Sequence, residues 1–184
     1  MFFFEKDELS KIEQISVEYA YLSIVSDELE SAKVIFRGID SSRANWGCFL
    51  VEALTGFVKR MPTYLEIRSF LEIDLDFLIK NQKIDYVESL LGATEYLINI
   101  NQETYKFVAR VMYENSFYEA CFNYLEKSKK IFYKDPELHF LYAKYYMNKK
   151  EILFAKFHID ECLKFLPDYY PAQKLNIEVS KYLA

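Results

Sequence analysis

The sequence predicts an all-α fold, a superhelix of antiparallel helix hairpins with about ten helices in a single continuous domain. Three observations lead to this prediction. The 184 residues include only 4 Gly and 4 Pro, too few for the many turns of a β-sandwich. Apolar residues recur at i, i+3, i+4 and i+7, the spacing of one helix face. In the C-terminal half this pattern returns with a 34-residue period.

Residues 1–62 are predicted to form N-terminal helices that include one irregular hairpin. Within residues 13–46, Ser26 is expected to cap a helix whose first turn is acidic. Residues 43–60 form a further predicted helix, which Met61-Pro62 closes. The 34-residue spacing slips here. Either helix 43–60 is an unpaired insert, or the N-terminal hairpins follow a different register.

Residues 63–169 contain three copies of the repeat, at 68–101, 102–135 and 136–169. In each copy an apolar helix is followed by a polar break and a second apolar helix. Small side chains let two antiparallel helices approach to about 8–10 Å. They recur in register in the last two copies, where Ala109 matches Ala143, Cys121 matches Ala155, and Ser128 matches Cys162. The first copy keeps the apolar stripe but loses most small residues, and Asp74 falls on its stripe.

With these residues the chain resembles the tetratricopeptide-repeat family. Its unit is a 34-residue helix–turn–helix with small residues at the eighth, twentieth and twenty-seventh places and proline near the thirty-second. Residues 136–169 match best, with Ala143, Ala155, Cys162 and Pro167 at those places. No copy has the family's usual glycine beside the inter-helix turn. The resemblance implies a superhelix whose concave face binds peptides or partner helices.

Residues 170–184 are predicted to form one terminal helix, with Pro171 in its first turn. A helix at this place would cover the apolar face that the last repeat otherwise exposes.

The net charge of the chain and the lengths of its apolar runs indicate which classes of partner to expect. The formal net charge is −5: residues 1–101 carry 17 acids and 10 bases, and residues 102–184 carry 11 acids and 13 bases. Since phosphate binding needs clustered Lys and Arg, we expect no nucleic-acid partner. No apolar run reaches the ~20 residues of a membrane span, and the N-terminus lacks a signal-peptide pattern. We therefore expect no membrane insertion and a cytoplasmic location.

The sequence carries no catalytic, metal-binding or cofactor-binding motif, so we expect neither an enzyme nor a metal or cofactor site. His139 takes the place of Tyr105 in the preceding copy and is predicted to be a packed core residue. His158 has only Glu161 nearby on its face, too few ligands for a metal. Cys121 and Cys162 occupy small-residue packing places, and an odd total of three cysteines without a CxxC argues against a disulfide framework.

The predicted binding face consists of first-helix residues that lie off the packing stripe. It mixes aromatic residues, a methionine and both signs of charge, a composition that suits a protein interface. The candidates are Glu72, Asp76 and Ile79 in the first copy, Glu103, Lys106, Arg110 and Tyr113 in the second, and Glu137, Phe140, Lys144 and Met147 in the third. Packing on the neighbouring copy explains Phe140 and Met147 equally well.

Two functions fit these features. The first is a chaperone or adaptor that holds a client peptide or helix in its concave groove. In architecture and charge the chain is similar to bacterial secretion chaperones of the tetratricopeptide type, including those of type III secretion. The second is a structural subunit of a larger complex or homo-oligomer, such as a homodimer. Its interface would include Trp46 and the Phe2-Phe3-Phe4 cluster.

Overall fold

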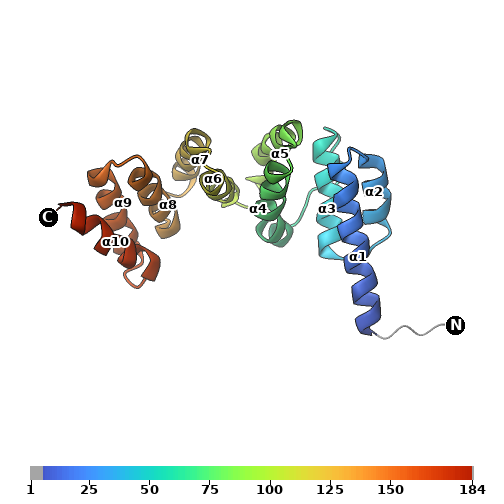
Figure 1. Cartoon of the computed structure of the whole chain (residues 1–184), viewed down its shortest axis with the longest axis horizontal. Coiled ribbons are helices and arrows are strands. Elements are labelled where there is room, and N and C mark those ends of the chain that lie inside the picture. The colour runs from blue at the N-terminus through green and yellow to red at the C-terminus, as the bar shows by residue number, and fades with distance from the viewer. Residues whose placement is uncertain (1–5, 184) are drawn as a thin grey trace. The chain divides into compact units, whose positions relative to one another are not determined.

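The computed structural model describes residues 6–183, so the Phe2-Phe3-Phe4 cluster lies outside the described residues. Within this range the chain forms ten α-helices joined by short connections, which confirms the all-α prediction (Figure 1). Helices that are neighbours in the sequence pack mostly on one another. In the described range no helix is both long and apolar enough to cross a membrane.

The chain divides after Asn101 into two compact units. Unit 1 contains α1 (Lys6–Val25), α2 (Leu29–Arg37), α3 (Ser42–Leu54), α4 (Tyr64–Lys80) and α5 (Ile84–Leu97). Unit 2 contains α6 (Thr104–Glu114), α7 (Tyr118–Ile131), α8 (Pro136–Asn148), α9 (Ile152–Phe165) and α10 (Tyr170–Leu183).

Four helix pairs, α1/α2, α4/α5, α6/α7 and α8/α9, are joined by turns of one backbone geometry. The second residue after the first helix adopts a left-handed conformation in each turn: Asp27 (φ 64°), Gln82 (φ 59°), Ser116 (φ 65°) and Lys150 (φ 59°). The following N–H bonds to the carbonyl oxygen five residues back, as from Phe117 to Met112 at 2.8 Å. This is the Schellman motif, which ends a helix and reverses the chain. The four pairs are therefore equivalent helical hairpins.

The spacing of these turns explains the slipped repeat. Gln82, Ser116 and Lys150 follow one another at the 34-residue spacing, whereas the interval from Asp27 to Gln82 is longer by more than half. The extra helix α3 accounts for the difference, and it contacts α1, α2, α4 and α5. The structure thus favours an unpaired insert over a changed register.

In unit 1 a buried carboxylate ties α3 into the core. The fully buried Asp74 on α4 accepts hydrogen bonds from the Tyr21 hydroxyl on α1 (2.8 Å) and the Trp46 indole on α3 (2.5 Å). The Arg43 guanidinium on α3 lies 2.5 Å from the other carboxylate oxygen. Burial raises the pKa of Asp74, and these three donors act against that rise. Asp74 therefore interrupts the apolar stripe because it joins three helices.

A close approach of α2 and α3 depends on a glycine. A Cβ atom at Gly47 would lie 2.5 Å from the Phe36 ring, which is itself buried. A larger residue at position 47 would force the two helices apart.

Two predicted boundaries in unit 1 are wrong. Ser26 does not cap α2, because residues 26–28 form the hairpin turn and α2 begins at Leu29. Helix 43–60 ends early: α3 stops at Leu54, where Gly56 adopts a φ of 76°. The Glu52 carboxylate then accepts the backbone N–H of Lys59 at 2.8 Å, which holds the following chain.

Unit 2 follows the 34-residue pattern closely. The matched small residues are buried, which confirms their predicted packing role; they are Ala109, Ala143, Cys121, Ala155, Ser128 and Cys162. Besides its own partner in the hairpin, α8 contacts α6, α7 and α10. Successive hairpins therefore pack side by side within this unit, with α10 against α8 and α9.

By the 34-residue spacing, the terminal helix α10 stands where the first helix of a further hairpin would stand. No second helix follows it in the described chain. Its buried residues Ala172 and Val179 pack back toward the preceding hairpin, and Val179 joins a core cluster with Ala143 and Ala155. The positions equivalent to those that face a second helix in α6 and α8 are Gln173, Ile177 and Ser180, all exposed. Two of these three are polar, which suits a capping helix.

Candidate protein-binding surface

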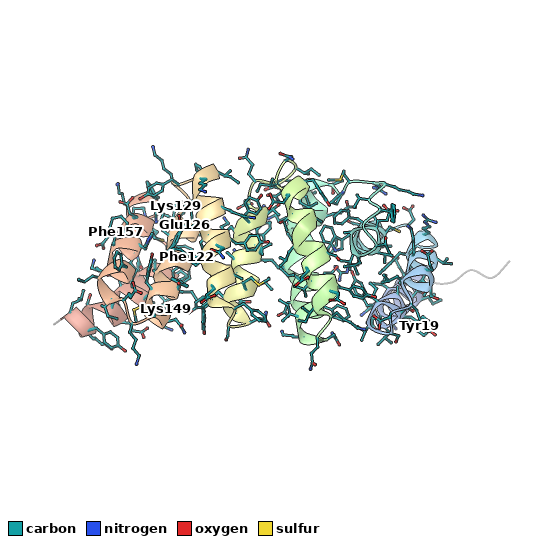
Figure 2. All side chains as sticks on the ribbon, turned by 90° about the horizontal axis from the view of Figure 1, so that it is seen from above. Tyr19, Phe122, Glu126, Lys129, Lys149 and Phe157 are labelled. Carbon is teal, nitrogen blue, oxygen red and sulfur yellow. The ribbon has the colours of Figure 1, made fainter. Side chains whose placement is uncertain are left out.

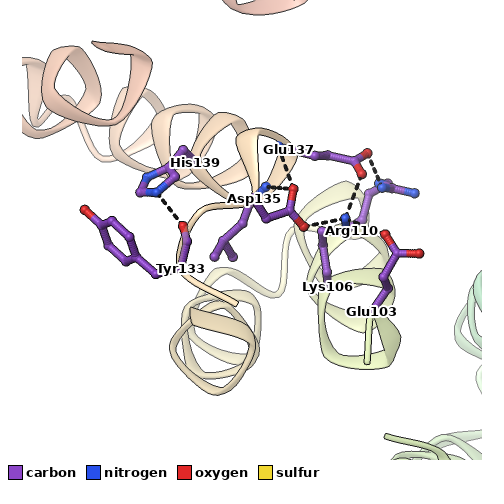
Figure 3. Close-up of polar contacts among 8 residues, drawn as sticks. Glu103, Lys106, Arg110, Tyr133, Asp135, Glu137 and His139 are labelled. Atoms are coloured by element: carbon purple, nitrogen blue, oxygen red, sulfur yellow. Dashed lines mark hydrogen bonds and ion pairs between the residues drawn. The ribbon is translucent and has the colours of Figure 1, made fainter. Parts of the chain in front are cut away.

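The eight candidates in unit 2 lie together on adjacent helices. Four come from α6 or the residue before it, and four from α8, which packs beside α6. We call this surface the first-helix face: Glu103, Lys106, Arg110, Tyr113, Glu137, Phe140, Lys144 and Met147. Figure 3 shows that the polar members near the start of α8 contact one another.

Lys106 is the centre of a buried ion network. Its side chain is 3% exposed, and its Nζ lies 2.6 Å from Asp135, 2.9 Å from Glu103 and 3.1 Å from Glu137 (Figure 3). Burial acts to lower the pKa of Lys106, but the hydrogen bonds to Asp135 and Glu103 outweigh it and leave the pKa raised. The ammonium is therefore charged at neutral pH and paired with three carboxylates.

Asp135 links this network to the start of α8. Its carboxylate accepts the backbone N–H groups of Glu137 (2.9 Å) and Leu138 (3.3 Å) as the helix N-cap. Glu137 also pairs with Arg110 of α6. Ion pairs from α6 thus fix the position of the first turn of α8.

Further along the same face, α6 and α8 meet through Tyr113 and Lys144. The Tyr113 hydroxyl donates to the Lys144 carbonyl oxygen at 3.2 Å, and the Lys144 ammonium lies 4.4 Å from the centre of the Tyr113 ring. This is a cation–π contact. No carboxylate lies within ion-pair distance of Lys144 in the described part of the chain, so its charge stays available at the surface.

The two apolar candidates pack within unit 2. Phe140 meets Tyr169 edge-on with ring centres 5.4 Å apart, and Met147 lies against the core cluster of Ala143 and Val179. Both side chains remain partly exposed. They therefore have a packing role and still contribute apolar surface to the face.

The three candidates of the first copy lie on α4 in unit 1. Asp76 pairs with Lys80 one turn later at 2.6 Å, and Glu72 and Ile79 are half-buried. They share one side of α4, as their spacing predicts.

The sequence reasoning missed the continuation of the first-helix face onto α10. Lys174, Glu178 and Lys181 stand one 34-residue repeat after Phe140, Lys144 and Met147. Together with Ile177 and Tyr182 they line an open hollow of about 600 Å³. The repeat spacing was the available signal, had it been extended into the terminal helix.

A histidine pair lies in the core between α8 and α9. The two Nδ1 atoms of His139 and His158 are 2.9 Å apart. His139 Nε2 lies 2.9 Å from the Tyr133 carbonyl oxygen, the contact drawn in Figure 3. A carbonyl only accepts, so His139 donates from Nε2, and its Nδ1 accepts from His158. The predicted core position of His139 is confirmed, since it is fully buried. His158 as its partner was missed, although the repeat equivalents Tyr105 and Tyr124 also contact one another.

The buried histidine His158 and the buried cysteines of unit 2 are held in their neutral forms at neutral pH. Burial lowers the pKa of His158 to about 4, and His139 adds to the effect. Burial raises the pKa of Cys121 to about 12 and of Cys162 to about 11. Free cysteines in such places behave as small apolar side chains, as the repeat pattern predicts.

The chain was compared with family models, curated proteins and solved structures, and none of them matches.

Proposed function

We propose that the chain is a protein-binding adaptor or chaperone with a tetratricopeptide-like superhelix, and that it holds a client peptide or helix on the first-helix face. The observation that carries this proposal is the continuity of that face over α6, α8 and α10. It joins aromatic and apolar side chains to charged ones, the composition of adaptable protein interfaces.

The charges on the face suggest which clients it suits. Lys106 and Arg110 are neutralised by Asp135, Glu103 and Glu137. Lys144, Lys174 and Lys181 have no carboxylate within ion-pair distance among the described residues. An acidic segment with apolar anchors would meet these three ammonium groups and the hollow beside them. A narrower form of this proposal is that the client belongs to a bacterial secretion system.

A charge-removal variant tests the proposal. Replacing Lys144, Lys174 and Lys181 by glutamine keeps helix propensity and removes the three unpaired cations. Client affinity, measured by calorimetry with a client isolated by affinity capture, is expected to fall at least about tenfold. The matched control replaces Lys130, Lys134 and Lys150, which are exposed on other parts of unit 2. Equal losses in both variants, or no loss in the first, would refute a first-helix site.

The identity of the captured proteins separates the two functions. A chaperone or adaptor returns one dominant client, whereas a structural subunit returns a fixed set in stoichiometric amounts. The observation that favours the second function is the exposed apolar stripe on α1, which includes Tyr19 at 63% exposure.

A further inference from the structure

Helix α1 has apolar residues on two opposite faces. Ala20, Tyr21 and Ile24 are buried against the rest of unit 1. A second stripe follows the spacing i, i+3, i+7, i+10 and remains exposed: Ile12 (48%), Ile15 (65%), Tyr19 (63%) and Leu22 (62%). A helix packed on one side normally turns polar residues to solvent. We call this second set the α1 stripe.

The geometry of unit 1 leaves the α1 stripe open. Helix α1 has 20 residues and α2 has 9, so α1 is about 30 Å long and α2 about 14 Å. In Figure 1 the N-terminal part of α1 extends past the ends of α2 and α3.

Unit 2 has a second apolar surface, on the outer side of α9. Leu153 (74%), Phe154 (57%) and Phe157 (52%) are exposed there, and we call them the α9 patch. Phe157 is labelled in Figure 2. Phe154 stacks on Tyr146 of α8 with ring centres 5.3 Å apart, which extends the patch over neighbouring aromatic residues.

The repeat shows that hairpin packing does not require the α9 patch. The equivalent positions in α7 are Glu119, Ala120 and Asn123. The same hairpin architecture is therefore built in α6/α7 without large apolar residues at these positions. Contiguous exposed apolar side chains that the hairpin architecture does not require indicate an interaction surface.

Charge favours contact between the two surfaces over contact of either with itself. Residues 1–101 carry 17 acids and 10 bases, a net charge of −7, while residues 102–184 carry 11 acids and 13 bases, a net charge of +2. Glu13 and Glu18 lie on α1 near its stripe, and the exposed Lys149 and Lys150 lie in the turn before α9, where Glu151 offsets one of the two positive charges. Two copies of unit 1 repel each other, whereas unit 1 of one copy attracts unit 2 of another.

We propose that the chain self-associates head to tail, with the α1 stripe of one copy docked on the α9 patch of a second copy. The contact is heterologous, so it leads to rings or open chains unless one surface is blocked. Surfaces of four and three apolar side chains make a small interface, below the standard size of specific complexes, so association is expected at high protein concentration. The proposal does not depend on client binding, because neither surface belongs to the first-helix face.

Two double variants test the proposal on the full chain. Ile15→Gln with Leu22→Gln replaces two of the four residues of the α1 stripe, and Leu153→Gln with Phe157→Gln replaces two of the three residues of the α9 patch. All four positions are exposed and glutamine keeps helix propensity, so both variants should fold. In light scattering coupled to size exclusion, the unaltered chain should grow in mass with concentration, and each variant alone should remain at the mass of one copy, 22.0 kDa.

Mixing the two variants is the decisive step. Each keeps the surface that the other lacks, so an equimolar mixture should form a species of two copies and nothing larger. Raising the salt concentration from about 0.1 M to about 0.5 M should weaken this pairing several-fold, because it screens the attraction. Val34→Gln and Ile177→Gln, at 68% and 65% exposure, are matched controls that should associate like the unaltered chain.

Three results would overturn the proposal. One is an unaltered chain that stays a single copy at about 1 mM, a concentration at which even weak association is seen. Another is an α9 variant that still dimerises, which would point to α1 pairing with itself. The third is a mixture that remains at the mass of one copy.

Discussion

Two buried charges organise the polar contacts of the two units. In unit 1, Asp74 collects donors from Tyr21, Arg43 and Trp46. In unit 2, Lys106 forms ion pairs with three carboxylates near the start of α8. Removing one partner of a buried ion network leaves the others unpaired, which costs more than the pair itself contributes.

We predict that Lys106→Met destabilises unit 2 by about 2 kcal/mol. This loss of stability is smaller than the loss expected for a fully buried ion pair, because Glu103 and Glu137 are 38% and 35% exposed and can be hydrated. Hydrogen exchange of the α6 and α8 amides measures the loss. The matched control is Lys156→Met, which removes a surface pair with Asp160 and should cost at most about 0.5 kcal/mol. Equal effects of the two changes would contradict a central role for Lys106.

The histidine pair predicts a loss of stability in acid. The folded pKa of His158 is about 4, below its ordinary value of 6.5, so the unfolded chain binds the extra proton first. The stabilising contribution is complete above pH 6.5 and is lost as the pH falls toward 4. The shift corresponds to roughly 3 kcal/mol. Lys129 also lowers the pKa of His158, while Glu126 and Glu161 raise it.

The variant His158→Phe checks this assignment. Phenylalanine can keep the stacking on Tyr142, whose ring centre is 4.5 Å from that of His158, and it cannot titrate. Urea unfolding at pH 7.0 and pH 5.0 should show a smaller pH dependence than in the unaltered chain. A pH dependence that does not change would mean that other groups cause the acid loss.

At the scale of elements, the recurring unit is the hairpin with its left-handed turn residue. Glycine adopts this conformation without steric cost, but Asp27, Gln82, Ser116 and Lys150 hold the position here. A left-handed conformation costs roughly 1–2 kcal/mol for a residue with a side chain. The packing of the two helices must therefore enforce each turn.

This predicts that Lys150→Gly stabilises the α8/α9 hairpin by about 0.5–1 kcal/mol, after the larger entropy of unfolded glycine is counted. Lys149→Gly is the matched control. Lys149 has an ordinary φ of −76°, so glycine there should destabilise by about 0.5–1 kcal/mol. The midpoint of thermal unfolding measures both changes. A lower midpoint for Lys150→Gly would contradict the strain assigned to the turn.

The helices were predictable where periodicity and caps agree. Asp135 before Pro136 marks the start of α8. The small residues that match between the two repeats are buried, as predicted. The end of α3 was missed because Gly56, its true stop, stands well before the proline to which the stop was assigned. Ser26 was misplaced because cap residues also occur in turns, and only the tertiary fold shows which role applies.

For the whole molecule, the sequence indicated stacked hairpins in the C-terminal half but not the division into two units after Asn101. The candidate face was found by spacing alone, and its members in unit 2 do lie on adjacent helices. Spacing could not reveal that Lys106 and Arg110 form ion pairs with carboxylates. The pairs with Asp135 and Glu137 join different parts of the chain. Nor could it reveal that Ile15, Tyr19 and Leu22 of α1 are exposed, since only the packing decides which stripe is buried.

Site-specific photo-crosslinking tests the central claim, that unit 2 binds a protein partner on its first-helix face. A benzophenone amino acid would replace Glu178 on that face, or Asn123 on the outer side of α7 as a control; both positions are exposed. In the cells that make this chain, the account predicts one dominant crosslinked partner from position 178 and none from position 123. Equal crosslinking from both positions, or none from position 178, would contradict the account.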